Sequence, residues 1–115
     1  IALEHALLQI DLSDDVNQRA TDACFFQKQV QTSAVTFFWA AALERMAWRY
    51  TERGYRYLHL DAGHVCQNLY LAAEVIGAGV CAIAAFDDEV LNQTLKLDGE
   101  NNFVVYVAST GKRPA

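Results

Sequence analysis

The sequence is poor in positive charge and in long apolar runs. Its 9 lysines and arginines face 14 aspartates and glutamates, which gives a net charge of −5. General polyanion binding needs a basic surface, so this balance argues against a nucleic-acid-binding protein. No apolar run approaches the roughly 18 residues of a membrane span, and no signal-peptide pattern opens the chain. These absences predict a protein that binds neither nucleic acid nor membranes.

Cysteine is scarce, and the spacing of the cysteines matches no known motif. The three residues, Cys24, Cys66 and Cys81, form no CxxC pair and no cysteine–histidine cluster at metal-ligand spacing. Their odd number favours free thiols that serve as small core residues in a reducing cytoplasm. Internal repeats, low-complexity linkers and the common phosphate-loop, nucleophile-elbow and zinc motifs are also missing. The sequence therefore predicts no metal site.

The composition is that of a folded core, because 53% of the 115 residues are apolar and 11% are aromatic. A chain of this length forms one small domain or one part of a larger domain. It begins at Ile1, and residues 2–12 favour a strand or a short amphipathic segment. We therefore expect residues 1–115 to be one part of a single, longer domain.

Helix and strand signals alternate along the rest of the chain. Capping residues and apolar spacing predict helices over residues 15–30, over residues 62–76 and after Asp87. Enrichment in β-branched and aromatic residues predicts buried strands over residues 33–40, 79–84 and 103–109. Asp61 is the expected N-cap of the central helix, and Phe86 with Leu91 forms a hydrophobic staple on the last one. This alternation favours a layered α/β or α+β fold.

The central helix, residues 62–76, is apolar on two faces, which predicts burial nearly all round. Its remaining polar strip consists of His64, Gln67, Asn68 and Glu74. Buried polar groups need partners, since an unsatisfied one costs about 1–3 kcal/mol. His64 is therefore either a structural residue satisfied within the fold or a contact to substrate or cofactor.

Arginines recur before this helix at Arg45, Arg49, Arg53 and Arg56. Intervals of four, four and three residues place them along one face if a helix continues across Gly54. Three interpretations are open: a solvated or ion-paired face, a subunit contact, and a phosphate or nucleic-acid stripe interleaved with aromatic residues. The acidic composition favours the first.

Two short segments are suited to a flat, anionic ligand. The turn at Ala84 and Ala85 offers backbone N–H groups beside a helix start, where small side chains let a flat molecule approach. Lys112 and Arg113 follow the last expected strand, where two cations can either bind a phosphate or form an ordinary basic tail.

From Trp48 onward the sequence resembles the nitroreductase-like flavoproteins, and within them the SagB-type dehydrogenases. The resemblance is carried, in order, by WRYTERGYRY, DAGHVCQNLYLAA, IGAGVCAIAAFDDEVLN and LKLDGENNFVVYVASTGK. It implies an α+β fold, the nitroreductase three-layer sandwich, with this chain as the C-terminal part of a dimer that shares its interface. It also implies an FMN-dependent oxidoreductase that transfers hydride to or from flavin N5, with NAD(P)H as electron donor and a small-molecule or peptide substrate.

The resemblance assigns roles to single residues. Ala84 and Ala85 would provide backbone contacts to the flavin ring near N5, where donors and a helix start stabilise the reduced flavin. Lys112 and Arg113 match the basic residues that hold the FMN phosphate, and His64 is a further candidate contact to the cofactor.

SagB-type enzymes oxidise azolines to azoles with a lysine–tyrosine pair, and the counterpart of that pair here is Arg49 and Tyr50. Arginine stays protonated at neutral pH, so it cannot accept the proton that a lysine can. Tyr50 is therefore the candidate proton carrier, and Arg49 is its catalytic neighbour.

The N-terminal half of the family, with its arginine-rich FMN-phosphate motif, has no counterpart in these residues. Two explanations are open, of which we prefer the first: a longer parent protein, or a truncated module that folds by dimerising. The expected partner is accordingly a second copy of the chain or the missing N-terminal half. A non-catalytic dimerisation or scaffold module with the same fold is the alternative function.

Overall fold

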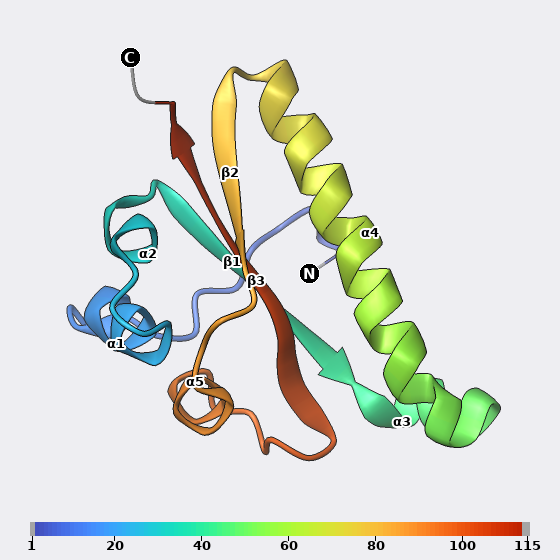
Figure 1. Cartoon of the computed structure of the whole chain (residues 1–115). Helices are drawn as coiled ribbons and strands as arrows, with labels where there is room; N and C mark the ends of the chain where they lie inside the picture. The colour runs from blue at the N-terminus through green and yellow to red at the C-terminus, as the bar shows by residue number, and fades with distance from the viewer. Residues whose placement is uncertain (1, 114–115) are drawn as a thin grey trace.

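A computed structural model of the chain describes residues 2–113, and its three strands form one antiparallel sheet. The strands are β1 (Val35–Ala42), β2 (Ala78–Ile83) and β3 (Asn102–Lys112). The long β3 lies in the middle, with β1 on one side and β2 on the other. Figure 1 shows the sheet between α4 (Gly54–Val75) and a group formed by α1 (Val16–Ala23), α2 (Lys28–Thr32) and α5 (Asp88–Thr94). The predicted three-layer α+β architecture is confirmed.

One hydrophobic core fills the space between the sheet and the group of α1, α2 and α5. Its buried members are Ala23, Cys24, Val30, Ile83, Leu91, Val104 and Val107. Leu91 is fully buried, and burial of a leucine side chain contributes about 1.5–3 kcal/mol. The core therefore fixes the position of α5 against the end of β2.

The start of α5 is as the sequence predicts. The Asp87 carboxylate accepts a hydrogen bond from the N–H of Val90, with 3.0 Å between the atoms. Phe86 packs against the core that holds Leu91, as the staple requires. In addition, the Asp87 N–H donates to the carbonyl of Ala23 at 2.8 Å, which ties the turn before α5 to α1.

The central helix is longer and more exposed than predicted. α4 already begins at Gly54, so Asp61 lies within the helix and the prediction that it is the N-cap is wrong. Burial all round is also wrong, because Leu71, Val75 and Ile76 are 60%, 87% and 79% exposed. One face of α4 covers the sheet, and no described residue covers the opposite face. The helix ends as predicted, at Gly77, whose φ of 68° suits a residue without a side chain.

Two expected helices are interrupted by residues with positive φ. The helix expected over residues 15–30 divides into α1 and α2, because Phe25 and Phe26 have φ values of 53° and 58°. Thr51, at φ 51°, ends α3 (Leu43–Tyr50) and begins the 3₁₀ turn η2 (Thr51–Arg53), which leads directly into α4. The four arginines therefore lie on different elements, and the prediction of one continuous arginine face is wrong.

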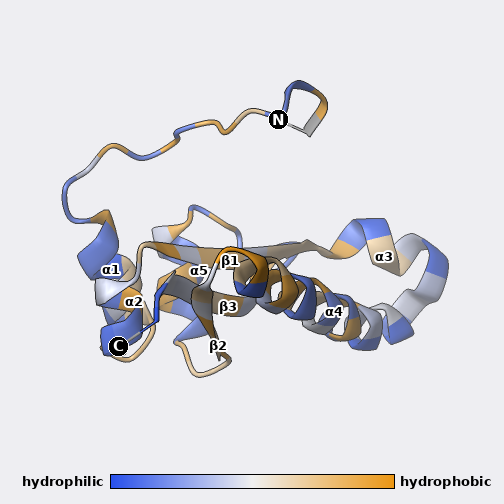
Figure 2. Cartoon of the chain, turned by 90° about the horizontal axis from the view of Figure 1, so that it is seen from above, coloured by the Kyte–Doolittle hydropathy of each residue, from blue (hydrophilic) through white to orange (hydrophobic). Residues whose placement is uncertain are grey.

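The predicted strands are found, with shifted ends. β1 and β2 differ from prediction by one or two residues, whereas β3 continues to Lys112, so that Lys112 is part of the strand and not beyond it. The strand suggested near the start is absent: after the 3₁₀ turn η1 (Ala2–Glu4), the chain runs without regular structure to α1. Figure 2 shows this segment leaving the body of the molecule. Leu7 within it is 100% exposed, because it pairs with no sheet edge that would bury it.

Candidate functional site

The turn between β2 and α5 presents free backbone donors. Ala84 and Ala85 are both exposed. Neither of their N–H groups has a hydrogen-bond partner among residues 2–113. The Ala85 carbonyl, by contrast, accepts a hydrogen bond from Nε2 of Gln27 at 2.8 Å, which holds the peptide in place. The turn is thus a fixed piece of backbone with two open donors and no bulky side chain, as a flat ligand requires.

The helix start beside this turn contributes less than the sequence suggested. α5 has only seven residues, with Asp88 and Glu89 in its first turn and the Asp87 carboxylate already bonded to the N–H of Val90. Three carboxylates offset the partial positive charge of the helix end. The donors of Ala84 and Ala85, rather than the helix dipole, are therefore what the turn offers to a ligand.

The outer edge of β2 carries a side chain that the sequence did not reveal. The Ala82 N–H donates to the hydroxyl oxygen of Tyr70 on α4, with 3.0 Å between the atoms. Tyr70 is 39% exposed. Its O–H hydrogen has no partner among the described residues, and the hydroxyl lies at Ala82, two residues before Ala84 in the turn.

The two cations near the C-terminus lie at the other end of β2. Lys112 pairs with Ala78, six residues before Ala84, a separation of roughly 20 Å along a strand. Arg113 is engaged by the Glu74 carboxylate and by the Ala78 carbonyl, whereas Lys112 is exposed and has no partner among residues 2–113. A ligand that contacts the turn and Lys112 together would have to lie along β2.

A cavity of about 630 Å³ adjoins this cationic end, between α2 and the ends of β2 and β3, and we call it the polar cavity after the amide, hydroxyl and cationic side chains in its lining. Ser109 lines it and is only 3% exposed, and its hydroxyl has no hydrogen-bond partner in the described part of the chain. Thr110, Lys112 and Arg113 also line it. A hydroxyl next to two cations suits an anionic oxygen ligand such as a phosphate group.

The three thiols differ in their surroundings. Cys24 and Cys66 are buried, and burial raises the pKa of both thiols, as expected of core cysteines. Cys81 is exposed, so the prediction that all three thiols lie in the core is wrong for this residue. Its side chain is on the wall of the polar cavity because β2 is an edge strand.

Arg49 and Tyr50 lie together at the end of α3. The Arg49 guanidinium carbon is 5.5 Å from the centroid of the Tyr50 ring. The Tyr50 ring in turn meets the ring of Tyr57 edge-on, with 4.8 Å between centroids. These contacts orient the Tyr50 ring, and its hydroxyl has no partner in the described chain, so the group is available to exchange a proton.

His64 is exposed on α4, and its Nδ1 lies 2.7 Å from the carbonyl oxygen of Leu60, one turn earlier. This hydrogen bond satisfies the ring within its own helix, which is the structural alternative left open by the sequence. Only Nε2 remains for a ligand.

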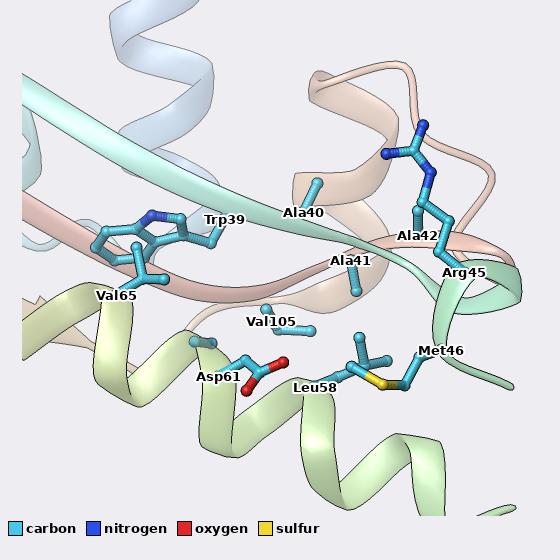
Figure 3. A pocket seen from close by; sticks show the side chains of 11 residues that line it. Trp39, Ala40, Ala41, Ala42, Arg45, Met46, Leu58, Asp61, Val65 and Val105 are labelled. Carbon is cyan, nitrogen blue, oxygen red and sulfur yellow. The ribbon is translucent and has the colours of Figure 1, made fainter. Parts of the chain in front are cut away.

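A second, mainly apolar cavity of about 320 Å³ lies between β1, α3 and α4. Its only charged lining residues are Arg45 and Asp61. Figure 3 shows the Asp61 carboxylate directed into the space between α4 and the sheet, whereas the Arg45 guanidinium points away from it. No ion pair joins the two side chains.

The sequence did contain a signal for Asp61. Once α4 is known to start at Gly54, the spacing places Leu58, Asp61 and Val65 on one helical face. Asp61 is thus an exposed carboxylate in line with apolar residues of that face. The signal was hidden because Asp61 was interpreted as the cap of a shorter helix.

Other site types find no support in the part of the chain that the structure describes. Residues 2–113 contain no group of three or more histidine, cysteine or acidic side chains arranged to hold a metal ion. Among the same residues, no helix has both the length and the apolar character needed to cross a bilayer.

Comparison with known proteins gives one family. The profile described as the Nitroreductase family matches residues 2–112. A Methanocaldococcus jannaschii protein named as a nitroreductase, MJ1384, is 33% identical over 93 residues, which cover 81% of this chain and 46% of the relative. The chain thus spans about half the length of that curated relative.

Two solved structures share the fold at low sequence identity. The microcin synthetase McbBCD complex of E. coli, with truncated pro-MccB17 bound, matches 98% of this chain and 42% of its own with a TM-score of 0.84 and 21% identity. The NADPH:FMN oxidoreductase of Vibrio harveyi, complexed with NAD⁺, matches 91% of this chain and 49% of its own with a TM-score of 0.76 and 19% identity.

Proposed function

The chain belongs to the nitroreductase family, and from that membership we propose that it is the C-terminal part of an FMN-dependent oxidoreductase of the SagB-type dehydrogenase kind. The observation that carries the proposal is the pair of free N–H donors at the exposed Ala84 and Ala85. The Vibrio harveyi neighbour is named as an NADPH:FMN oxidoreductase, which supports NAD(P)H as electron donor. The microcin synthetase neighbour supports the peptide-modifying subgroup.

The residues present suit FMN at both ends of β2. Bound FMN supplies the exchange of a hydride with the substrate. The donors of Ala84 and Ala85 would bind the electron-accepting edge of the ring, because fixed N–H groups stabilise negative charge without rearrangement. Lys112, with Arg113 and the Ser109 hydroxyl, would hold the phosphate in the polar cavity.

Tyr50 is the proposed proton carrier, through its hydroxyl. Its ring is held by Tyr57 and by the neighbouring Arg49 guanidinium. The Arg49 guanidinium stays protonated at neutral pH, so it would orient the Tyr50 ring without accepting a proton itself. His64, with Nε2 free, is a weaker candidate for a contact to the cofactor.

The partner is proposed from the apolar surface that the chain leaves uncovered. The outer face of α4 exposes Leu71, Val75 and Ile76, and the segment before α1 exposes Leu7 and Ile10. Exposed apolar surface of this extent marks an interaction site. A second copy of the chain, or the N-terminal half of a longer domain, would cover it. We propose the cytoplasm as the location, because the chain has three free cysteines.

A dimerisation module without catalysis is the second candidate, favoured by the same exposed face of α4. It predicts a stable dimer that takes up no FMN. The enzyme instead predicts flavin uptake and reduction by NAD(P)H.

Titration with FMN, followed by flavin fluorescence and size-exclusion chromatography with light scattering, distinguishes the two. FMN uptake that is reduced by NAD(P)H supports the enzyme. A colourless dimer that leaves added FMN free in solution removes the enzyme and retains the module.

A further inference from the structure

We propose that the cavity between β1, α3 and α4 binds an organic cation with a flat apolar body, held by the carboxylate of Asp61. This inference rests on the proposed oxidoreductase function and names the class of substrate, but the binding itself needs no cofactor.

The walls favour an apolar body. On the β1 side, Figure 3 shows the side chain of Ala41 pointing into the cavity, and its small size leaves space that a larger residue would fill. Leu58 and Val65 of α4 close the opposite side. A volume of about 320 Å³ accommodates a single ring with a short substituent. Transfer of such a group from water is favourable in proportion to its apolar area.

The charge favours a cation. Asp61 makes no hydrogen bond and no ion pair within residues 2–113, and Figure 3 shows its carboxylate directed into the cavity. Arg45, the only other charged lining residue, points away. Asp61 is exposed, so it attracts a cation as a surface carboxylate does, with an attraction that salt screens. Neutral or anionic analogues of the same shape gain nothing from it.

The aromatic side favours a flat ligand. The Trp39 ring lines the cavity and is held by contacts to Phe37 and Tyr106, with centroid distances of 6.3 Å and 6.1 Å. A ring fixed in this way offers a surface for stacking and for cation–π attraction.

The register of the sheet brings the cavity near the turn with free donors. Trp39 pairs with Tyr106, and Ile83 pairs with Val107, so Ala84 follows in the row of Trp39 and Tyr106. Two strand spacings separate Trp39 from Ala84, a distance on the order of 10 Å. A substrate with its charged end at Asp61 would therefore extend toward the flavin-binding turn.

The test compares benzamidine with benzamide, which share size and flatness but differ in charge. Binding of each to the purified protein is measured by isothermal titration calorimetry without FMN. We expect benzamidine to bind about threefold more tightly, as an exposed carboxylate allows, and the preference to fall with added salt. Asp61→Asn should abolish the preference, whereas Arg45→Gln, the matched control, should retain it.

Equal affinity for the two probes, or no binding of either, overturns the proposal, and this comparison needs no variant. A preference for benzamidine that survives in a folded Asp61→Asn protein also overturns it. Failure of the proposed function gives a different result, since a protein that prefers benzamidine but never takes up FMN retains the cation site and loses the flavin.

Discussion

The hydroxyl oxygen of Tyr70 accepts a hydrogen bond from the backbone N–H of Ala82, so that α4 caps the outer edge of β2 at the level where the proposed flavin site begins. Tyr70→Phe removes this acceptor and leaves the N–H to water. We expect the free energy of unfolding to fall by about 0.5–1.5 kcal/mol and the Ala82 amide to exchange its hydrogen faster. Urea denaturation and NMR hydrogen exchange measure both.

Tyr55→Phe is the matched control for this change. Tyr55 stacks on Phe103 at a centroid distance of 6.4 Å, and its hydroxyl has no partner in the described chain. Tyr55→Phe should therefore leave the free energy of unfolding nearly unchanged. Equal effects of the two substitutions would mean that the hydroxyl of Tyr70 contributes nothing specific.

Asn92 links α5 to the middle of the sheet. Its side-chain oxygen accepts a hydrogen bond from the Val104 N–H at 2.9 Å, and Asn92 is 6% exposed. Asn92→Ala leaves a buried N–H unpaired, which should lower the free energy of unfolding by about 1–3 kcal/mol. Gln93→Ala, on the exposed side of the same helix, should change it by less than about 0.5 kcal/mol in urea denaturation. Similar losses from both would show that Val104 finds another partner.

Asp98 makes stability depend on acid. The N–H groups of Asn102 and Glu100 donate to its carboxylate and lower its pKa to about 2. An unfolded aspartate titrates near about 3.9, so the stabilisation is complete above that pH and is lost as the pH falls toward about 2. Asp98→Asn keeps an oxygen acceptor without the titrating charge. Thermal unfolding followed between pH 5 and pH 2 should therefore show a steeper acid loss in the wild type than in the variant, and parallel curves would contradict this.

The elements that the sequence predicted well are those specified by neighbouring residues. Asp87, Phe86 and Leu91 define the start of α5 within a few positions, and Gly77 defines the end of α4. The interruption at Thr51 has no such local signal, because neither glycine nor proline occurs there, while Gly54 only three residues later is an ordinary helical residue. Tertiary packing of α3 against α4 decides the break.

The same limit applies to the site. Backbone donors at Ala84 and Ala85 could be predicted from small residues next to a capped helix. The role of Asp61 could not be predicted, since it depends on where α4 begins and on which face of α4 meets the sheet. The apolar sequence of α4 indicated that its surface must be covered. It could not indicate that the described residues cover only one face of the helix.

Thr51 adopts a conformation that favours glycine, with φ 51° and ψ −135°. A β-branched residue at positive φ is an outlier that costs about 1–3 kcal/mol. Thr51→Gly relieves this strain. Glycine also gives the unfolded chain more freedom, which costs about 0.5–1 kcal/mol, so the free energy of unfolding should rise by about 1 kcal/mol in net. Thr51→Ala keeps the Cβ atom and should gain nothing. Denaturation curves in which Ala and Gly behave alike would show that the backbone is not strained.

A substitution in the polar cavity can distinguish binding of the FMN phosphate from binding of the flavin ring. Lys112 is free to bind a phosphate, whereas Arg113 is already engaged by Glu74. Lys112→Gln should weaken FMN binding about tenfold, the loss of one charge-assisted contact, and should leave riboflavin, which has no phosphate, unchanged. Fluorescence titration with both flavins measures this. An equal loss of affinity for FMN and riboflavin would mean that Lys112 contacts the ring or supports the fold. No loss for FMN would mean that the phosphate is held elsewhere, by a cation from the partner chain or from a preceding half-domain.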